Sequence, residues 1–114
     1  CCMHMSQSVF SKIINREIPA TIMAETDHII VIKDINPKAS IHFLIIPKKE
    51  VRDIQSFEQH DFELGLHMFA MAHYLSKTVP GAEDFRLQIN SGAGAGQEVF
   101  HLHMHFLAGT FFSI

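Results

Sequence analysis

The sequence predicts a single α+β domain that combines five short strands with one short and one long helix. Two patterns lead to this prediction. Five runs of β-branched and other apolar residues are bounded by turn-forming residues, and one longer segment has the periodicity of an amphipathic helix. A length of 114 residues suits one domain. The expected strands are residues 21–25, 29–33, 41–46, 85–90 and 99–107.

The short helix is expected near the beginning of the chain. Ser8 is a favourable N-cap residue, and Phe10, Ile13 and Ile14 then fall on one side of the helix. We expect Pro19 to end this helix, because proline cannot continue the helical hydrogen-bond pattern.

The long helix is expected over residues 56–79. Ser56 and Gln59 have the spacing of a capping box, and Pro80 and Gly81 close the segment. Two apolar stripes run along it, so we expect the sheet to cover one side and a partner subunit the other. One stripe consists of Phe62, Leu66, Phe69 and His73, and the other of Leu64, Met68, Met71 and Leu75.

The composition narrows the classes of function. The net charge is −3 and the basic residues are dispersed, which argues against nucleic acid as a partner but allows a single nucleotide. The longest apolar stretches are too short to span a membrane. Cys1 and Cys2 are the only cysteines and are adjacent, so we expect a reducing, cytoplasmic location. Residues 1–7 are expected to be a disordered end or a remnant of cloning.

The most informative segment contains alternating histidines. Side chains of a strand alternate between faces, so His101, His103 and His105 are expected to share one face. The residues between and beside them are expected to face the core: Phe100, Leu102, Met104 and Phe106. This pattern allows three interpretations, namely a histidine-rich polar face, a metal site, or a site for phosphoryl or nucleotidyl transfer.

The metal interpretation meets a geometric difficulty. Same-face neighbours on a strand lie about 6.7 Å apart and the outer pair about 13 Å, whereas zinc–nitrogen bonds are about 2.1 Å long. A straight strand therefore brings at most two of the three histidines to one ion. The long helix offers His60, His67 and His73 at spacings that do not match a zinc motif. We expect no catalytic metal and no other cofactor.

The transfer interpretation uses the chemistry of imidazole. A largely neutral imidazole offers a ring nitrogen as a nucleophile at pH 7, and neighbouring imidazoles can carry a proton. The glycine-rich loop at residues 91–96 precedes the histidines, and its backbone N–H groups could bind phosphate oxygens. By itself this loop favours a flexible turn over a phosphate site, because no Walker motif follows it, and its position directly before the histidines is what adds weight to the phosphate site.

The segment from Gly96 to His105, with the sequence Gly-Gln-Glu-Val-Phe-His-Leu-His-Met-His, resembles the signature of the histidine-triad (HIT) family. Several other segments resemble the nucleotide-binding, phosphoramidase (HINT-like) branch of that family. They are Phe10-Ser11-Lys12-Ile13-Ile14, Glu17-Ile18-Pro19-Ala20, Asp34-Ile35-Asn36-Pro37, residues 42–49, and Ala108-Gly109. The resemblance extends over nearly the whole chain, so residues 8–114 are interpreted as a single histidine-triad domain.

The resemblance implies a five-stranded antiparallel sheet with a long helix, paired into a homodimer. It implies that His103 attacks the α-phosphorus of a nucleotide and is transiently nucleotidylated. By the same match, His101 and His105 orient the nucleophile or contact phosphate. His42 matches a fourth histidine near the triad, although from its own context it could simply be a buried strand residue.

The resemblance also assigns the nucleotide-binding residues. Asp34 matches a carboxylate that accepts both ribose hydroxyls, whereas its context alone indicates a turn residue. The apolar purine slot is matched by Val9, Phe10, Ile13, Ile32 and Ile35, which could equally be ordinary core. The phosphate side is matched by Asn90, Gly96 and Gln97, with Val99 contributing backbone.

Two features depart from the family pattern. Glu98 stands where some relatives have serine near the leaving group, and a carboxylate donates a proton only if its pKa is raised. The identity of the proton donor is therefore open. The chain also ends soon after the triad, at Ile114, whereas many relatives have a longer tail that shapes the substrate site.

Taken together, the residues and the resemblance predict a cytoplasmic, homodimeric hydrolase of purine nucleoside 5′-phosphoramidates. Its partners would be purine nucleotides such as an adenosine phosphoramidate or adenosine monophosphate. Two alternatives remain, a dinucleoside polyphosphate hydrolase of the same superfamily and a non-catalytic nucleotide sensor.

Overall fold

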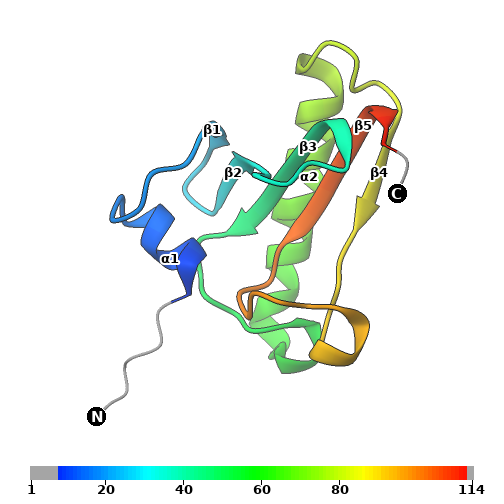
Figure 1. Ribbon diagram of the computed structural model, residues 1–114. Coiled ribbons are helices and arrows are strands. Elements are labelled where there is room, and N and C mark those ends of the chain that lie inside the picture. Colours follow the sequence, from blue (N-terminus) through cyan, green and yellow to red (C-terminus); the bar gives the residue numbers. More distant parts are fainter. Residues whose placement is uncertain (1–7, 113–114) are drawn as a thin grey trace.

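The computed structural model describes residues 8–112, so the predictions for residues 1–7 lie outside the described part. The sheet has five antiparallel strands in the order β1-β2-β3-β5-β4. This confirms the predicted α+β class with one short and one long helix (Figure 1). The elements are α1 (Val9–Ile14), β1 (Ile22–Glu25), β2 (Ile29–Lys33), β3 (Ala39–Pro47), α2 (Phe62–Thr78), β4 (Phe85–Gln88) and β5 (Met104–Phe111).

The two faces of the sheet have different coverings. Alternate residues of β2, β3 and β5 pack against α2, among them Val31, Ile45 and Phe106. The intervening residues of β2 and β3 form a smaller core with α1, which consists of Phe10, Ile13, Ile30, Ile32, Leu44 and Ile46. In Figure 1, α2 runs behind the sheet and α1 lies at the end of β2. Much of the α1 face therefore stays open, and the candidate site lies there.

Helix α1 begins as predicted and ends earlier than predicted. The Ser8 hydroxyl oxygen accepts a hydrogen bond from the Ser11 N–H at 2.9 Å, as an N-cap residue does. The helix stops at Ile14 rather than at Pro19, because Arg16 takes a left-handed conformation with φ of 64°.

Helix α2 begins at Phe62 rather than at Ser56, after two 3₁₀ turns, η2 (Ile54–Ser56) and η3 (Gln59–Asp61). The predicted capping role of Ser56 is wrong because its hydroxyl donates to the Asp53 carboxylate at 2.6 Å. The capping box is formed by Glu58 and Asp61 instead, and the Glu58 N–H donates to the Asp61 carboxylate at 2.9 Å.

Strand β5 also begins later than predicted, at Met104 instead of residue 99, and it continues to Phe111. The backbone before it bonds outside the sheet. The Gln97 side chain donates to the Val99 carbonyl at 3.0 Å, and the Leu102 N–H donates to the Val51 carbonyl at 2.7 Å. Because these groups are already engaged, residues 98–103 cannot join the ladder.

One of the two predicted stripes of α2 is covered within the chain. Leu64, Met68, Met71 and Leu75 are buried against the sheet. The other stripe is open, and the exposed fractions of Phe62, Leu66 and Phe69 are 60%, 69% and 60%. Within the described residues, no helix is both long and apolar enough to cross a membrane.

The conformation of β5 near its end depends on glycine. Gly109 has φ of +78°, and a Cβ placed there would collide with the Ser40 hydroxyl. We therefore expect Gly109→Ala to lower the free energy of unfolding by about 1–3 kcal/mol, as measured by urea denaturation. Gly94→Ala is the matched control, because a Cβ there meets no atom within 4 Å. Equal stability of the two variants would contradict this account.

Candidate active site

The ring of His103 is held in one tautomer by the backbone. Its Nδ1 lies 2.8 Å from the His101 carbonyl oxygen, which can only accept, so Nδ1 carries the proton. The lone pair of the neutral ring is therefore on Nε2. Phe10 packs edge-on against the ring at 5.0 Å between centroids. Burial lowers the pKa of His103, and the His101 carbonyl and Asp34 oppose this only in part, so the neutral form dominates at pH 7.

His101 is fully buried and has a different environment from the other two triad histidines. Its Nε2–H donates to the Pro47 carbonyl at 2.7 Å, and its Nδ1 lies 2.7 Å from the Ser8 hydroxyl, which donates to it. The prediction that all three histidines share one strand face is wrong, because residues 98–103 do not form a strand. His101 reaches the site only through its backbone carbonyl, which orients His103.

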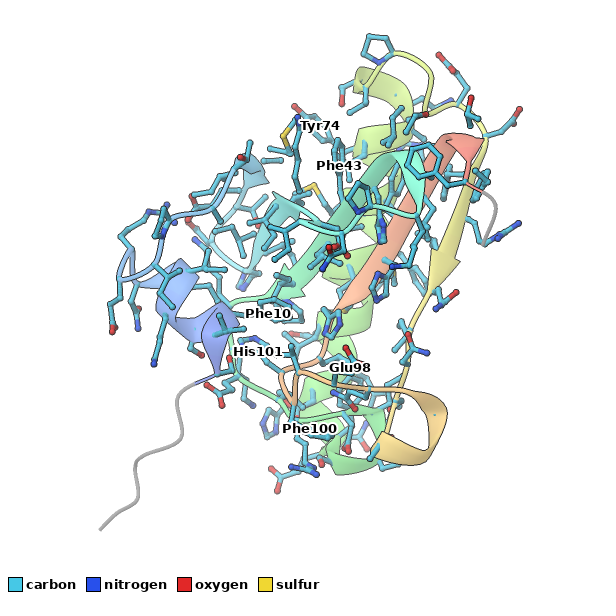
Figure 2. All side chains as sticks on the ribbon, viewed as in Figure 1. Phe10, Phe43, Tyr74, Glu98, Phe100 and His101 are labelled. Atoms are coloured by element: carbon cyan, nitrogen blue, oxygen red, sulfur yellow. The ribbon has the colours of Figure 1, made fainter. Side chains whose placement is uncertain are left out.

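Sequence reasoning missed the polar cluster that holds His101. The Ser11 hydroxyl donates to the Glu50 carboxylate at 2.5 Å and lies 3.5 Å from His101 Nδ1. Ser8 was expected only as a helix cap, yet its hydroxyl both caps α1 and donates to His101. Figure 2 shows His101 next to Phe10 of α1. The first helix is thereby attached to the segment that positions His103, a contact that no local pattern reveals.

His42 and His105 form a hydrogen-bonded pair on the open face of the sheet. His42 Nε2 lies 2.9 Å from His105 Nδ1, and the two side chains come from the adjacent strands β3 and β5. The Lys38 N–H donates to His42 Nδ1 at 2.9 Å. The proton of neutral His42 is therefore on Nε2, which donates to His105, and His105 keeps its own proton on Nε2.

Desolvation makes both histidines of this pair weak bases. It is the largest cause that lowers the pKa of His42, and it lowers the pKa of His105 to about 4 together with the nearby His103 and His42. The Asp34 carboxylate acts in the opposite direction on both. Asp34 Oδ2 lies 3.3 Å from His42 Nε2 and 3.9 Å from His105 Nδ1.

Asp34, His42 and His105 are also close enough to be considered as metal ligands. The sequence analysis did not foresee this grouping, which joins one triad histidine to two residues from other segments. The protonation pattern nevertheless disfavours an ion, because His42 Nδ1 accepts from the backbone and the proton on Nε2 leaves no lone pair. A second cluster of Glu58, His60 and Asp61 is at the surface, where Lys49 already binds Asp61 at 2.6 Å.

The glycine-rich loop is an ordered turn held by two amide side chains. Gln97 Oε1 accepts from the Gly92 N–H at 2.7 Å, and Gln97 Nε2 donates to the carbonyls of Arg52 and Val99. The Asn90 amide donates to the Ala95 carbonyl at 2.8 Å. The side chain of Gln97 is therefore fully engaged within the protein and supports the loop rather than a ligand.

An open cleft brings these segments together. It is lined by His42, His103 and His105, whereas His101 does not reach it. It also contains every other residue for which a ligand contact was predicted, which are Val9, Phe10, Ile13, Ile32, Asp34, Ile35, Asn90, Gly96, Gln97, Glu98 and Val99. No sequence pattern predicted the further residues that line it, among them Lys33, Lys38, Leu44, Arg86, Gln88 and Phe112. Figure 2 shows Glu98 on the loop side of the cleft, across from Phe10.

The apolar residues of the cleft are buried on one side and exposed to solvent on the other. Phe10, Ile13 and Ile32 are buried and belong to the smaller core, so they serve as both core and cleft wall. Val9 is half-exposed, and Ile35 exposes 92% of its surface at the rim. The flat apolar wall beside Asp34 suits an aromatic ring with a polar attachment.

Comparisons with known proteins agree with this geometry. A family model described as "HIT domain" matches residues 15–112. An uncharacterised HIT-like protein of Synechocystis sp. is 44% identical over 106 residues, which is 93% of each chain. A HIT family hydrolase from Clostridium thermocellum is 39% identical, with 96% of each chain covered and a TM-score of 0.88. A histidine triad protein from Clostridium difficile is 33% identical, with 98% of each chain covered and a TM-score of 0.89. This chain belongs to the HIT domain family.

Proposed function

We propose that this protein hydrolyses the phosphorus–nitrogen bond of purine nucleoside 5′-phosphoramidates. His103 Nε2 attacks the α-phosphorus, the amine leaves, and water then cleaves the nucleotidyl-histidine to release the nucleoside monophosphate. The single observation that carries the proposal is the hydrogen bond from His103 Nδ1 to the His101 carbonyl at 2.8 Å. It leaves a neutral imidazole with its Nε2 lone pair free in a cleft.

The surroundings of His103 support a phosphorylated substrate. The ring of His105 lies 5.2 Å from that of His103 between centroids, and its Nε2–H is a donor for phosphate oxygen. The N–H groups of Gly92, Ala95, Gly96 and Gln97 bond within the loop, so in this proposal the backbone N–H groups of Glu98 and Val99, which follow the loop and line the cleft, contact the phosphate. Catalysis in such a site rests on positioning and on charge stabilisation, since imidazole itself provides the nucleophile.

The other half of the cleft suits a nucleoside. In this proposal Asp34 accepts the ribose hydroxyls, and the purine lies against the apolar wall formed by Phe10, Ile13 and Ile32. Asn90, Gly96 and Val99 line the same cleft, and in this proposal they lie near the phosphate. The likeness to a HIT family hydrolase is consistent with hydrolysis as the reaction. We place this activity in the cytoplasm and in one domain spanning residues 8–114, with no metal required.

The open apolar stripe of α2 supports a homodimer. A side chain such as Leu66 at 69% exposure is unfavourable in water, and a second copy would cover the whole stripe at once. A symmetric contact of this kind buries the same residues from both subunits.

The principal test removes the nucleophile. We expect His103→Ala and His103→Asn to lower the turnover of an adenosine phosphoramidate by a factor of about 10³ or more, because covalent catalysis and proximity are lost together. Rapid quenching of the parent during turnover should trap a nucleotide that peptide mapping assigns to His103.

His60→Ala is the control, since His60 lies at the surface. A well-folded His103 variant with near-parental turnover would refute the mechanism. Parallel assays with a dinucleoside polyphosphate distinguish the substrate class.

The pKa of His103 predicts the acidic side of the pH profile. Protonation of Nε2 removes the nucleophile, and burial holds this pKa below its ordinary value of 6.5. Activity should therefore persist as the pH falls through 6.5 and decline only at lower pH. The measurement is kcat/KM between pH 5 and 8, since this ratio reports the free enzyme. An acidic midpoint at or above 6.5 would show that His103 is not desolvated in the manner described.

Light scattering tests the dimer. We expect a mass of twice the 12.9 kDa chain at micromolar concentration. Leu66→Glu should shift the mass towards the monomer, because it places a charge in the centre of the stripe. Glu17→Lys changes an exposed charge away from this helix and should leave the mass unchanged. A parent protein that is monomeric at this concentration would contradict the proposed interface.

A further inference from the structure

The carboxylate of Asp34 is bound into the histidine pair as well as facing the cleft. Its Oδ1 accepts a hydrogen bond from the Asn36 N–H at 2.8 Å, which fixes the orientation of the group. Its Oδ2 lies 3.3 Å from His42 Nε2 and 3.9 Å from His105 Nδ1. One oxygen of a partly buried carboxylate is thus next to both of the nitrogens that share a proton.

This arrangement determines whether the pair can hold one more proton. In the neutral pair, one proton lies between His42 Nε2 and His105 Nδ1. If His105 became an imidazolium, N–H groups of both rings would point at each other, which is unfavourable unless an acceptor lies beside them. Asp34 Oδ2 lies 3.3 Å from His42 Nε2, which is within hydrogen-bond distance, so it can accept the His42 proton. Its negative charge also acts on His105 Nδ1 from 3.9 Å, without a hydrogen bond.

The charges around the His42–His105 pair also indicate that Asp34 favours an additional proton on it. Asp34, Lys38 and His103 are the groups whose charge acts on His105, together with His42 itself. Lys38 and a protonated His103 oppose a positive charge there, and Asp34 favours it. In the free protein the pKa of His105 is about 4, so a proton is taken up only when an anionic substrate adds its own negative charge.

We propose that Asp34 makes the His42–His105 pair the general acid and base of the reaction, in addition to its contact with ribose. This inference rests on the proposed function, and it supplies a proton donor that does not depend on Glu98. Asp34 acts here as a positioning residue for the pair.

The proton balance closes over the two steps. In the first, His103 Nε2 bonds to phosphorus, the phosphorus–nitrogen bond breaks, and the leaving nitrogen takes the Nε2 proton of the His105 imidazolium. His105 keeps its Nδ1 proton, and the negative charge of Asp34 Oδ2, 3.9 Å away, stabilises it there. In the second step, the oxygen of water bonds to phosphorus, the bond to His103 breaks, and His105 Nε2 takes the proton that water releases. The imidazolium is thereby regenerated.

Combining a variant of Asp34 with an altered substrate separates its role in proton transfer from ribose binding. One change is Asp34→Asn, which keeps an oxygen for the Asn36 N–H, and the other is removal of both ribose hydroxyls from the substrate. If Asp34 binds only ribose, the variant and the parent hydrolyse the 2′,3′-dideoxy phosphoramidate with equal kcat, and the proposal is overturned. We expect instead that Asp34→Asn lowers this kcat by roughly a hundredfold, as for loss of a general acid. Asp27→Asn makes the same chemical change at an exposed turn and should have no effect.

The nature of the leaving group provides a second criterion. An alkylamine must be protonated as it departs, whereas a weakly basic nitroaniline needs little assistance. The loss of kcat in Asp34→Asn should therefore be large for the alkylamine and small for the nitroaniline. An equal loss for both leaving groups would overturn the role in proton transfer.

A measurement without turnover keeps the two proposals distinguishable. NMR titration of the His105 ring should be carried out with the methyl ester of 2′,3′-dideoxyadenosine monophosphate, whose phosphate does not titrate near neutral pH. We expect the pKa of bound His105 to be lower in Asp34→Asn than in the parent, and an unchanged pKa would overturn the inference. If the parent hydrolyses no phosphoramidate, the proposed function fails, whereas this titration still decides the role of Asp34.

Discussion

The antiparallel register between β3 and β5 is the constraint on which the site depends. It pairs Leu44 with His105 and His42 with Leu107, so the two histidines become diagonal neighbours on one face. The same register pairs Phe43 with Phe106 on the other face, beneath α2. A slip of one residue would exchange the faces, which would expose the core and bury the histidines in it. The packing of α2 and the geometry of the site are therefore set by a single pairing.

Backbone carbonyls and N–H groups then give each histidine its own chemistry. The His101 carbonyl places the proton of His103 on Nδ1, the Pro47 carbonyl places that of His101 on Nε2, and the Lys38 N–H places that of His42 on Nε2. Three residues of one type thereby differ in function: His103 has a free Nε2 lone pair, His101 is a structural anchor, and His42 is a donor. Fixed backbone groups can do this reliably because their own direction is determined by the fold.

Burial keeps the site in the neutral form that this chemistry needs. Desolvation is the largest cause of the lowered pKa at His42, His101, His103 and His105. In the free protein the opposing influence of Asp34 is too weak to restore ordinary basicity. In the free protein the imidazoles of the cleft are therefore uncharged at neutral pH, and the negative charge of an anion bound there would raise their proton affinity.

The sequence by itself determined the class of the fold, and its resemblance to a family indicated many of the residues that line the cleft. Periodicity and turn residues are local properties, and they predicted five strands and two helices with errors at the ends where side chains compete for backbone groups, as at Ser56 and Gln97. The alternation of histidines indicated a site, yet its extension to His101 was wrong because the chain leaves the strand conformation before Met104. Only the tertiary structure decided which histidine is an anchor, that Ser8 and Glu50 hold the segment before His103, and that Asp34 lies beside His42 and His105. These relations join residues up to 93 positions apart, and they follow from strand register and helix docking, for which the sequence has no local periodic signal.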